Sequence, residues 1–290
     1  MSSEKVIELT NTDKSYGRRK VLDGLGLSVY RNNVYALLGG NGEGKTTAIR
    51  MVAGQMEPDS GSVRVFGLDP VRCGGEVKAR FAYVAELMKV YDRMTLAELG
   101  RFLKPFYSKW RDGKLTELAE TFGLPLDRGL REFSRGMYAK GVLALALCRE
   151  PELLILDDPC LGLDTASRRN FMEMLVGSLT EYDCTVLLST HLIPEAAGIV
   201  DRVGILKNGR LAVEADAAEL QRDIRRLRLS AAQEPLLPEL ETVRRKTAGP
   251  ELVLAVKGGE QLRERLSVVP GLEFELDPLP LEEIFLAYSE

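Results

Sequence analysis

Residues 39–46 read Gly39-Gly40-Asn41-Gly42-Glu43-Gly44-Lys45-Thr46, and this stretch decides the fold. It fits the pattern G-x-x-x-x-G-K-[ST]. It follows the apolar run from Val34 to Leu38 and opens a segment with helical spacing from Lys45 to Ala53. Glycines let a backbone wrap around phosphate groups, and the amides at a helix N-terminus attract anions. The stretch therefore predicts a phosphate-binding loop between a buried strand and a helix.

A second motif follows about a hundred residues later. The apolar run from Leu153 to Leu156 predicts a buried strand, and it ends in Asp157 and Asp158. A carboxylate at the end of a strand beside a phosphate loop can hold the ligand shell of Mg²⁺, and an adjacent one can position or deprotonate a water molecule. Apolar strands that end in aspartate are common, so this motif indicates a metal site only in combination with the phosphate loop.

The rest of the chain divides into blocks. Short strands at 6–10 and 27–30 come before the loop, and helical spacing dominates from about 86 to 150. Beyond Pro151, buried strands alternate with helices, which predicts a mostly parallel sheet. We find no internal repeat.

The end of the chain has a different pattern. A charged helical segment is predicted from 217 to 228, and residues 234–250 indicate a break with turns. After this break, residues 251–257 alternate like a strand, and residues 281–288 are spaced like an amphipathic helix. This end of the chain is therefore predicted to form a distinct tail.

Composition narrows the class of protein. The chain has 290 residues, of which 45% are hydrophobic and 28% charged, and its net charge is -4. This composition indicates a globular protein without a strong electrostatic attraction to nucleic acid. The longest apolar run, 142–148, is too short to span a bilayer, and the first residues lack the apolar core of a signal peptide. The four scattered cysteines indicate reduced thiols and no disulfide framework. We therefore expect the protein to stay in the cytosol.

The motifs, taken in order, resemble the ATP-binding cassette of ABC transporters over about residues 4 to 225. The motifs that carry the resemblance are the phosphate loop, Phe133-Ser134-Arg135-Gly136-Met137, the run from Leu153 to Asp158, Gly162-Leu163-Asp164, and Ser189-Thr190-His191. The chain lacks the NKxD sequence with which GTPases bind guanine, which favours adenine.

The resemblance implies a fold and a domain division. The fold is α/β, with a P-loop NTPase (RecA-like) core, an N-terminal antiparallel β subdomain and an α-helical subdomain over about 86–150. Residues 1–225 would form the cassette, and residues 226–290 would form a small C-terminal α+β accessory domain.

The resemblance also assigns site residues. Tyr16 would stack on adenine, and Asp164 would lie in the loop that joins two composite sites. The phosphates would be bound by Gly39, Asn41, Gly42, Gly44, Lys45, Thr46 and Thr47, and by Ser134 and Gly136 of a second cassette. Mg²⁺ would be held by Thr46, Glu86 and Asp157, and catalysis would use Asp158, Glu86 and His191.

The residues themselves leave alternatives for several of these roles. Tyr16 also fits a surface tyrosine at a strand end, and Ser134 fits an ordinary helix N-cap. Asp164 fits a solvated loop carboxylate.

Two departures from the family pattern concern the predicted chemistry. Asp158 stands where active members have glutamate, which retracts the carboxylate by about 1.5 Å. Since a misplacement of about 1 Å can cost about 100-fold in rate, we expect slow hydrolysis. Glu86 replaces the usual glutamine, which keeps an oxygen ligand but adds negative charge near the phosphates.

Other departures lie in the loops. Arg135 and Met137 replace a small residue and an amide, and Arg135 could supply charge to a phosphate or be solvated. Glu43 replaces a small residue of the phosphate loop, and we expect its side chain to point away from the anion. Cys160 replaces the usual threonine after a proline, without a consequence that we can name.

The function implied by the resemblance is an ATP-binding and ATP-hydrolysing subunit of an ABC exporter. Two cassettes, identical or different, would close on ATP and drive a separate integral-membrane permease. The permease would contact residues 87–98, because residues 90–95 resemble those of drug or bacteriocin-resistance exporters. The subunit would be cytoplasmic and peripheral on the inner face of the membrane. The alternatives are a hydrolytically impaired ATP-sensing subunit that pairs with a competent cassette, and a soluble ABC protein that acts on DNA or ribosomes.

Overall fold

The computed structural model describes residues 4–85, 91–179, 183–190 and 198–289. Its centre is a six-stranded sheet in the order β5-β6-β7-β3-β8-β9, parallel except for the antiparallel pair β8 and β9. The strands are β3 (Val34–Gly39), β5 (Phe81–Ala85), β6 (Leu153–Asp157), β7 (Thr185–Thr190), β8 (Arg202–Lys207) and β9 (Arg210–Asp216). Because β3, β6 and β7 are parallel neighbours, their carboxyl ends meet at one edge. The predicted α/β fold is confirmed.

Both faces of this sheet are buried, because successive strand side chains point to opposite sides. Leu153, Ile155 and Leu187 pack in one core with helix α1 (Lys45–Val52) and the N-terminal strands. On the opposite face, Leu154, Leu156 and Leu188 pack in a second core with α5 (Arg135–Leu147) and α6 (Thr165–Leu179). Helix α2 (Gly74–Arg80) precedes β5, and α8 (Ala217–Asp223) follows β9.

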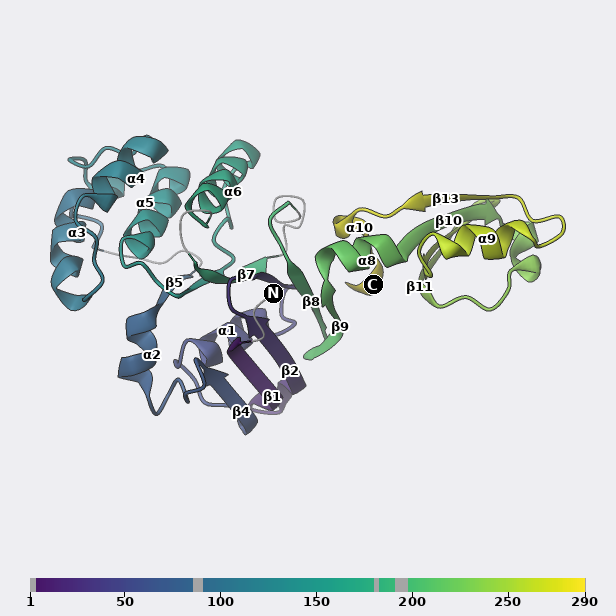
Figure 1. Cartoon of the computed structure of the whole chain (residues 1–290), viewed down its shortest axis with the longest axis horizontal. Helices are drawn as coiled ribbons and strands as arrows, with labels where there is room; N and C mark the ends of the chain where they lie inside the picture. Colours follow the sequence, from purple (N-terminus) through teal and green to yellow (C-terminus); the bar gives the residue numbers. More distant parts are fainter. Residues whose placement is uncertain (1–3, 86–90, 180–182, 191–197, 290) are drawn as a thin grey trace.

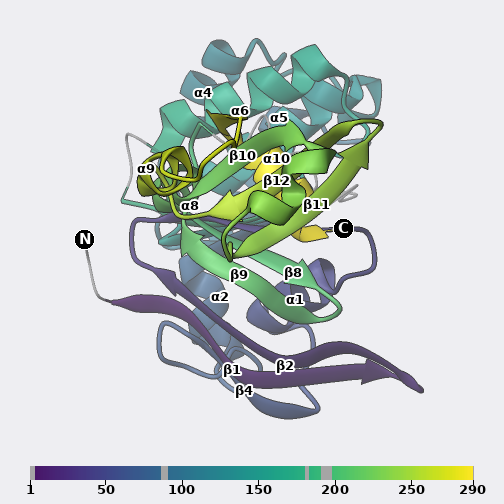
Figure 2. The same cartoon turned by 90° about the vertical axis from the view of Figure 1, so that its right-hand side faces the viewer.

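The N-terminal subdomain is an antiparallel sheet in the order β2-β1-β4, seen below the central sheet in Figures 1 and 2. Its strands are β1 (Lys5–Tyr16), β2 (Arg19–Tyr30) and β4 (Ser60–Val65). The sequence predicted only parts of β1 and β2. The pairing of these two strands shifts register at several positions, and each bulge interrupts the alternation from which a strand is predicted.

The predicted helical block is also present, on the opposite side of the sheet from the antiparallel subdomain (Figures 1 and 2). Its α-helices are α3 (Leu96–Leu103), α4 (Lys114–Phe122) and α5. Thr95 and Glu98 form a capping box that starts α3, and Gly123 ends α4 with a positive φ. Short 3₁₀ turns are η1 (Lys104–Phe106) and η2 (Leu130–Glu132). No helix among the described residues combines the length and apolar character that crossing a bilayer requires.

The C-terminal region extends away from the cassette as a four-stranded antiparallel sheet in the order β11-β12-β10-β13 (Figure 1). Its elements are β10 (Ile224–Ser230), η3 (Ala231–Leu236), β11 (Thr242–Ala248), β12 (Glu251–Lys257), α9 (Gln261–Ser267) and β13 (Phe274–Pro278). Leucines of β10 and β12 pack against α9 in a separate small core.

Two predictions for this region are wrong. The helix predicted from 217 to 228 ends at Asp223, because Arg226, Leu227, Arg228 and Leu229 alternate with period two and form β10. The break predicted for 234–250 contains β11. This strand lies at the sheet edge and carries mostly polar side chains, so it lacks an apolar face in the sequence.

The last helix, α10 (Leu281–Ser289), returns to the cassette. Its residues Leu281, Ile284 and Phe285 belong to the same core as strands β3 and β6. The domain boundary expected between residues 225 and 226 falls within β10. The chain therefore leaves the cassette at β10 and closes part of the cassette's core with its C-terminal helix.

Candidate functional site

The phosphate loop joins β3 to α1, as the motif predicted. Gly44, at the N-terminus of α1, has φ of 107°. A Cβ atom on Gly44 would lie 2.6 Å from Leu22 Cδ2 and 3.0 Å from the Val21 carbonyl oxygen. Only glycine fits this position, because the conformation is left-handed and the neighbouring atoms leave no space for a side chain. Gly44 makes no side-chain cap hydrogen bond, so the first amides of α1 face the loop.

Lys45 supplies a positive charge inside the loop. Its Nζ donates hydrogen bonds to the carbonyl oxygens of Gly39 (2.8 Å) and Gly40 (3.1 Å), and the residue is only 5% exposed. Burial lowers the pKa of Lys45, and the nearby carboxylates of Asp158 and Asp157 oppose this shift. Phosphate oxygens can replace the two carbonyl oxygens as acceptors, so the loop fits a polyphosphate.

Asp157 ends β6 beside the phosphate loop and is buried. Its Oδ1 accepts hydrogen bonds from Thr46 Oγ1 (3.2 Å) and Ser189 Oγ (2.6 Å), and its Oδ2 lies 3.5 Å from the Tyr83 hydroxyl. Burial, with Asp157 nearby, raises the pKa of Tyr83 to about 12, so this hydroxyl is neutral and donates. A hydroxyl and a carboxylate are oxygen donors of the kind that Mg²⁺ prefers, so Thr46 and Asp157 fit the predicted metal site.

Asp158 follows with φ of 45°, which is unusual for a residue other than glycine. Its backbone N–H lies 3.1 Å from both the carbonyl oxygen and the Oγ of Ser189. The structure thus brings Lys45, Thr46, Asp157 and Asp158 together around one loop. No motif in the sequence pointed to Tyr83, and Ser189 was not predicted as a site residue. The only signal for Ser189 is its place in the Ser-Thr-His motif.

Glu86 and His191, which complete the predicted site, lie outside the described residues. Among the other predicted phosphate ligands, Asn41 and Gly42 lie on the outer part of the loop, and Thr47 is buried in the first turn of α1.

Tyr16 and Arg19 face each other across the turn of the β1–β2 hairpin. Tyr16 is 47% exposed, and its hydroxyl donates to the Met56 sulfur at 3.3 Å. Arg19, which the sequence analysis missed, donates from Nη2 to the Gly42 carbonyl oxygen at 3.2 Å. The hairpin that carries Tyr16 is therefore tied to the phosphate loop.

Glu43 points toward the β8–β9 turn, where its carboxylate accepts a hydrogen bond from the backbone N–H of Asn208. A negative side chain in a phosphate loop would repel the ligand. This contact keeps the carboxylate of Glu43 at the β8–β9 turn and away from the ligand.

The Ser134–Gly136 segment starts α5. Ser134 accepts a hydrogen bond from the Met137 N–H at 3.2 Å, so it is an N-cap. Arg135 Nη1 lies 3.5 Å from the Gly162 carbonyl oxygen, and a Cβ atom on Gly136 would lie 2.8 Å from Ser167 Oγ. These contacts join the start of α5 to the loop that precedes α6.

Asp164 lies in that loop. Its carboxylate accepts hydrogen bonds from the Ser167 N–H (2.9 Å) and hydroxyl (2.8 Å), and these bonds lower the pKa of Asp164. A charged carboxylate at the start of α6 also suits the helix dipole. Asp164 therefore organises the loop that Arg135 contacts.

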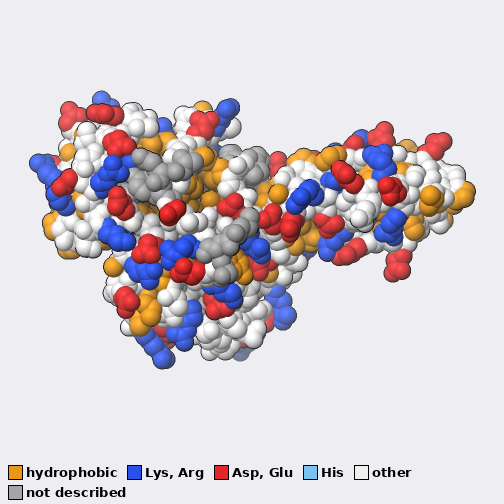
Figure 3. Space-filling view, viewed as in Figure 1, with side chains coloured by type: hydrophobic (Ala, Val, Ile, Leu, Met, Phe, Trp, Pro, Cys, Tyr) orange, Lys and Arg blue, Asp and Glu red, His pale blue; other side chains and the backbone are white. Residues whose placement is uncertain are grey.

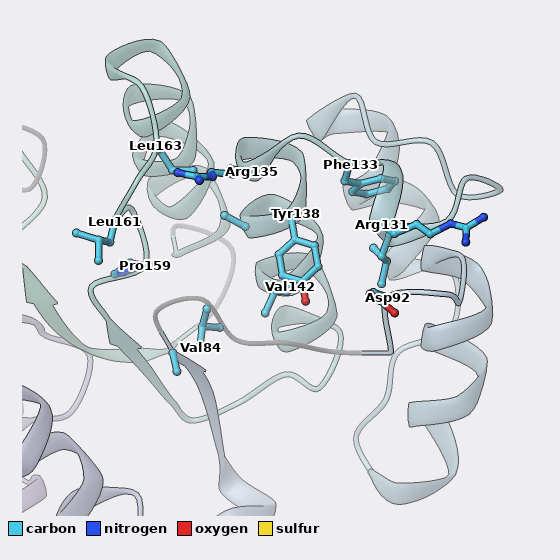
Figure 4. A pocket seen from close by; sticks show the side chains of 13 residues that line it. Val84, Asp92, Arg131, Phe133, Arg135, Tyr138, Val142, Pro159, Leu161 and Leu163 are labelled. Atoms are coloured by element: carbon cyan, nitrogen blue, oxygen red, sulfur yellow. The ribbon is translucent and has the colours of Figure 1, made fainter.

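A cavity of about 620 Å³ opens between the central sheet and the helical subdomain (Figure 4). Val84 lines it at the end of β5, and Tyr138 and Val142 line it on α5. Figure 4 shows Arg135 extending toward the loop that carries Leu161 and Leu163. The end of β5 and the loop after β6 thus share one hollow with the start of α5.

Charge on the surface is mixed. On the face shown in Figure 3, acidic and basic side chains are interspersed over both the cassette and the C-terminal sheet. This pattern agrees with the small net charge of -4.

Comparison with known proteins finds the sequence profile described as ABC transporter over residues 22–161. The chain is 35% identical over 239 residues to a daunorubicin/doxorubicin resistance ATP-binding protein of Streptomyces peucetius, covering 79% of this chain and 72% of that protein. It is 32% identical to a bacitracin transport ATP-binding protein of Bacillus licheniformis, covering 72% and 69%. It is 31% identical to a Nod factor export ATP-binding protein of Paraburkholderia xenovorans, covering 98% and 96%.

The chain is also similar to solved structures of ATP-binding cassettes. The ATP-binding subunit of an ABC transporter matches with a TM-score of 0.67 and 29% identity, covering 75% of this chain and 92% of that one. An ADP-bound cassette matches with a TM-score of 0.63 and 22% identity, covering 75% and 93%. The latter likeness concerns the fold alone.

Proposed function

The chain belongs to the ABC transporter family, and on this premise we propose that it binds and hydrolyses ATP as the nucleotide-binding subunit of an exporter. The observation that carries the proposal is the buried ammonium of Lys45 inside a glycine loop, with Thr46 hydrogen-bonded to Asp157 beside it. A positive charge that is held by carbonyl oxygens within a loop of backbone amides suits an anionic ligand. The drug and bacitracin functions named for two relatives, and the export named for a third, support an exporter.

In the proposed mechanism the loop amides and Lys45 bind the phosphates, and Tyr16 stacks on adenine with its exposed ring. Thr46 and Asp157 would hold Mg²⁺. When bound, this ion neutralises charge on the β- and γ-phosphates. Asp158 accepts hydrogen bonds from the attacking water and takes its proton, and Glu86 and His191 are proposed to assist.

We further propose that two cassettes close on ATP, with Ser134 and Gly136 of one facing the nucleotide of the other. The N-terminus of α5 supports this role, because its amides and dipole favour an anion. Arg135 adds a positive charge at the same place. Closure would expel water and complete the site.

Slow turnover is part of the proposal, because Asp158 is one methylene shorter than glutamate. Asp158→Glu should raise the steady-state rate of phosphate release, and Asp158→Asn should abolish it, with ATP affinity kept in both variants. Rapid turnover by the wild-type protein without a membrane partner would contradict the slow rate.

The proposed contact with the permease is on the helical subdomain. Tyr91, Phe102 and Phe106 are exposed, at 62%, 41% and 68%, and their rings touch, with centroid distances of 5.4 Å and 5.6 Å between successive rings. Exposed aromatic side chains that cluster are typical of protein interfaces. Tyr91 of this cluster lies within residues 87–98, so we propose the cluster as the contact with a membrane subunit, which would hold the protein on the cytoplasmic face.

Two measurements test the function. Lys45→Ala should lose ATP binding by equilibrium titration, whereas Lys78→Ala, which removes an exposed lysine from α2, should bind like the wild type. Affinity purification from membranes should recover a multi-spanning protein, and the double change Tyr91→Ala and Phe106→Ala should reduce its yield. Unchanged ATP binding by Lys45→Ala would refute the proposed site.

A second candidate is an ATP-sensing subunit that pairs with a competent cassette. Asp158 and Glu86 favour it, because both replace residues that active cassettes use for hydrolysis. Phosphate release by the homodimer, compared with that of a mixed complex, separates the two functions.

A further inference from the structure

Ser189 contacts the carboxylate of Asp157 and the backbone N–H of Asp158. It occupies the end of β7, opposite Asp157 of β6 in the strand register, and it is fully buried. Its Oγ is 2.6 Å from Asp157 Oδ1, and the N–H of Asp158 is 3.1 Å from the same Oγ. A single hydroxyl therefore contacts both residues that the proposed function assigns to metal binding and water activation.

The direction of these two hydrogen bonds follows from chemistry. A serine hydroxyl has one donor hydrogen and can accept through its lone pairs, and a carboxylate only accepts. The hydrogen of Ser189 therefore goes to Asp157, and a lone pair receives the N–H of Asp158. Hydrogen bonds to ionised carboxylates are short and about twice as strong as neutral ones.

Packing alone does not require this hydroxyl. Leu187 and Leu188 precede Ser189 in β7, and all three are buried. An alanine would suit such a strand and would leave no polar atom to satisfy. The hydroxyl instead makes two hydrogen bonds within the site. It holds Asp157 Oδ1, the oxygen that Thr46 also contacts. Together with the Ser189 carbonyl oxygen, it holds the left-handed backbone of Asp158, whose φ is 45°.

We propose that Ser189 is a positioning residue that sets the metal-binding orientation of Asp157 and the backbone of Asp158 at the same time. The inference rests on the proposed function, because it concerns how this chain holds Mg²⁺ with ATP. Residues that orient metal ligands change metal affinity about 10- to 100-fold when they are removed. Ser189 should therefore act on metal affinity and turnover, and it should leave metal-free ATP binding intact.

The test compares Ser189→Ala with Thr185→Val. Thr185 is a matched control, since it is a buried hydroxyl at the other end of β7, where its Oγ1 accepts the N–H of Asn32 at 3.0 Å. Mn²⁺ serves as the probe, and its affinity for the ADP-bound protein is measured by electron paramagnetic resonance. ATP binding is measured separately in EDTA, and thermal midpoints report stability.

Ser189→Ala is expected to weaken Mn²⁺ binding about 10-fold or more and to leave ATP affinity in EDTA within about 2-fold. Thr185→Val should lower the thermal midpoint without changing Mn²⁺ affinity. If Ser189→Ala is too unstable to study, Ser189→Thr keeps the hydroxyl and should bind Mn²⁺ within about 3-fold of the wild type.

Two results overturn the inference. Either Ser189→Ala binds Mn²⁺ like the wild type, or Ser189→Ala and Thr185→Val weaken Mn²⁺ binding equally. A wild-type protein that binds no nucleotide would instead refute the proposed function. The two failures are therefore distinguishable.

Discussion

The phosphate loop and the start of α5 are both helix N-termini, yet they are built differently. At α1, Gly44 adopts a left-handed conformation and has no side-chain cap. At α5, Ser134 caps the helix by accepting the Met137 N–H. The first helix thus leaves its amides for a ligand, and the second uses one of them internally.

The two regions also differ in their neighbours. Around the phosphate loop, Lys45, Thr46 and Asp157 converge from one chain. Around the start of α5, Arg135 contacts Gly162, and Gly136 faces Ser167. The phosphate loop therefore gathers its binding groups within one chain, whereas under the proposed function the α5 region would face a nucleotide bound by a second molecule. We therefore expect substitutions in the two regions to affect ATP binding differently.

The largest effect is expected for Gly44→Ala. The added Cβ would collide with Leu22 and with the Val21 carbonyl group, and φ would stay unfavourable. We expect ATP binding to fall more than about 100-fold, with a loss of about 2 kcal/mol or more in the free energy of unfolding. Isothermal titration and urea unfolding measure these changes.

Gly123→Ala is the control for Gly44→Ala. Gly123 also has a positive φ, 63°, but a Cβ atom on it would meet no atom of the described residues within 4 Å. This variant should lose about 1 kcal/mol of stability and should keep ATP affinity. If both variants keep ATP affinity, the phosphate loop is not the nucleotide site.

Gly136→Ala should show that the phosphate loop and the start of α5 have different roles. A Cβ on this residue would lie 2.8 Å from Ser167 Oγ and 3.1 Å from Ser167 Cβ, so the start of α5 or Ser167 must shift. We expect unchanged ATP binding by the single subunit and about 10-fold lower turnover, because a displacement of about 1 Å at a catalytic surface has effects of this size or larger. Ser167→Ala in the same chain should restore part of the rate. Weakened ATP binding by the single subunit would contradict the contrast.

Glu152 provides a test that is remote from both loops, since it precedes β6 at the end opposite to Asp157. Arg80 donates two hydrogen bonds to Glu152, at 3.0 Å and 2.8 Å, and these bonds lower the pKa of Glu152 to about 2. Because the folded pKa is below the unfolded value, this stabilisation is present above about pH 5 and is lost as the pH falls toward 2.

Glu152→Gln should therefore cost about 1 to 2 kcal/mol at pH 7, since solvent screens part of the interaction, and less than about half of that at pH 3. Urea unfolding at both pH values measures the difference. ATP affinity should not change. A cost that is equal at pH 7 and pH 3 would mean that the carboxylate charge does not stabilise the fold.

The smallest effect is expected for Ser134→Ala. Loss of the N-cap should reduce the free energy of unfolding by about 1 kcal/mol, and ATP binding by the single subunit should stay unchanged. Chemical denaturation and nucleotide titration measure both quantities. Restored stability in Ser134→Asp, another good N-cap, would confirm that the change acts through the helix end.

Some parts of the molecule could be predicted and others could not. The central α/β sheet and helices such as α4 were predicted because their apolar spacing is local in the sequence. Strand β11 was missed because an exposed edge strand has no apolar face. The first part of β10 was predicted as helix because its arginines continue the charged segment that begins in α8. The packing of α10 against the cassette was missed because a short amphipathic helix carries no information about its partner.

The sequence by itself determined the phosphate loop, the strand that ends in Asp157 and Asp158, and the family. Each is a contiguous pattern, and its chemistry depends on residues that are neighbours in the chain. Only the tertiary structure decided that Ser189 joins the Asp157 carboxylate to the Asp158 backbone, that Tyr83 faces Asp157, and that Arg19 holds the phosphate loop. These contacts join residues far apart in the sequence, and they depend on strand order and register, which the long-range packing of the core sets.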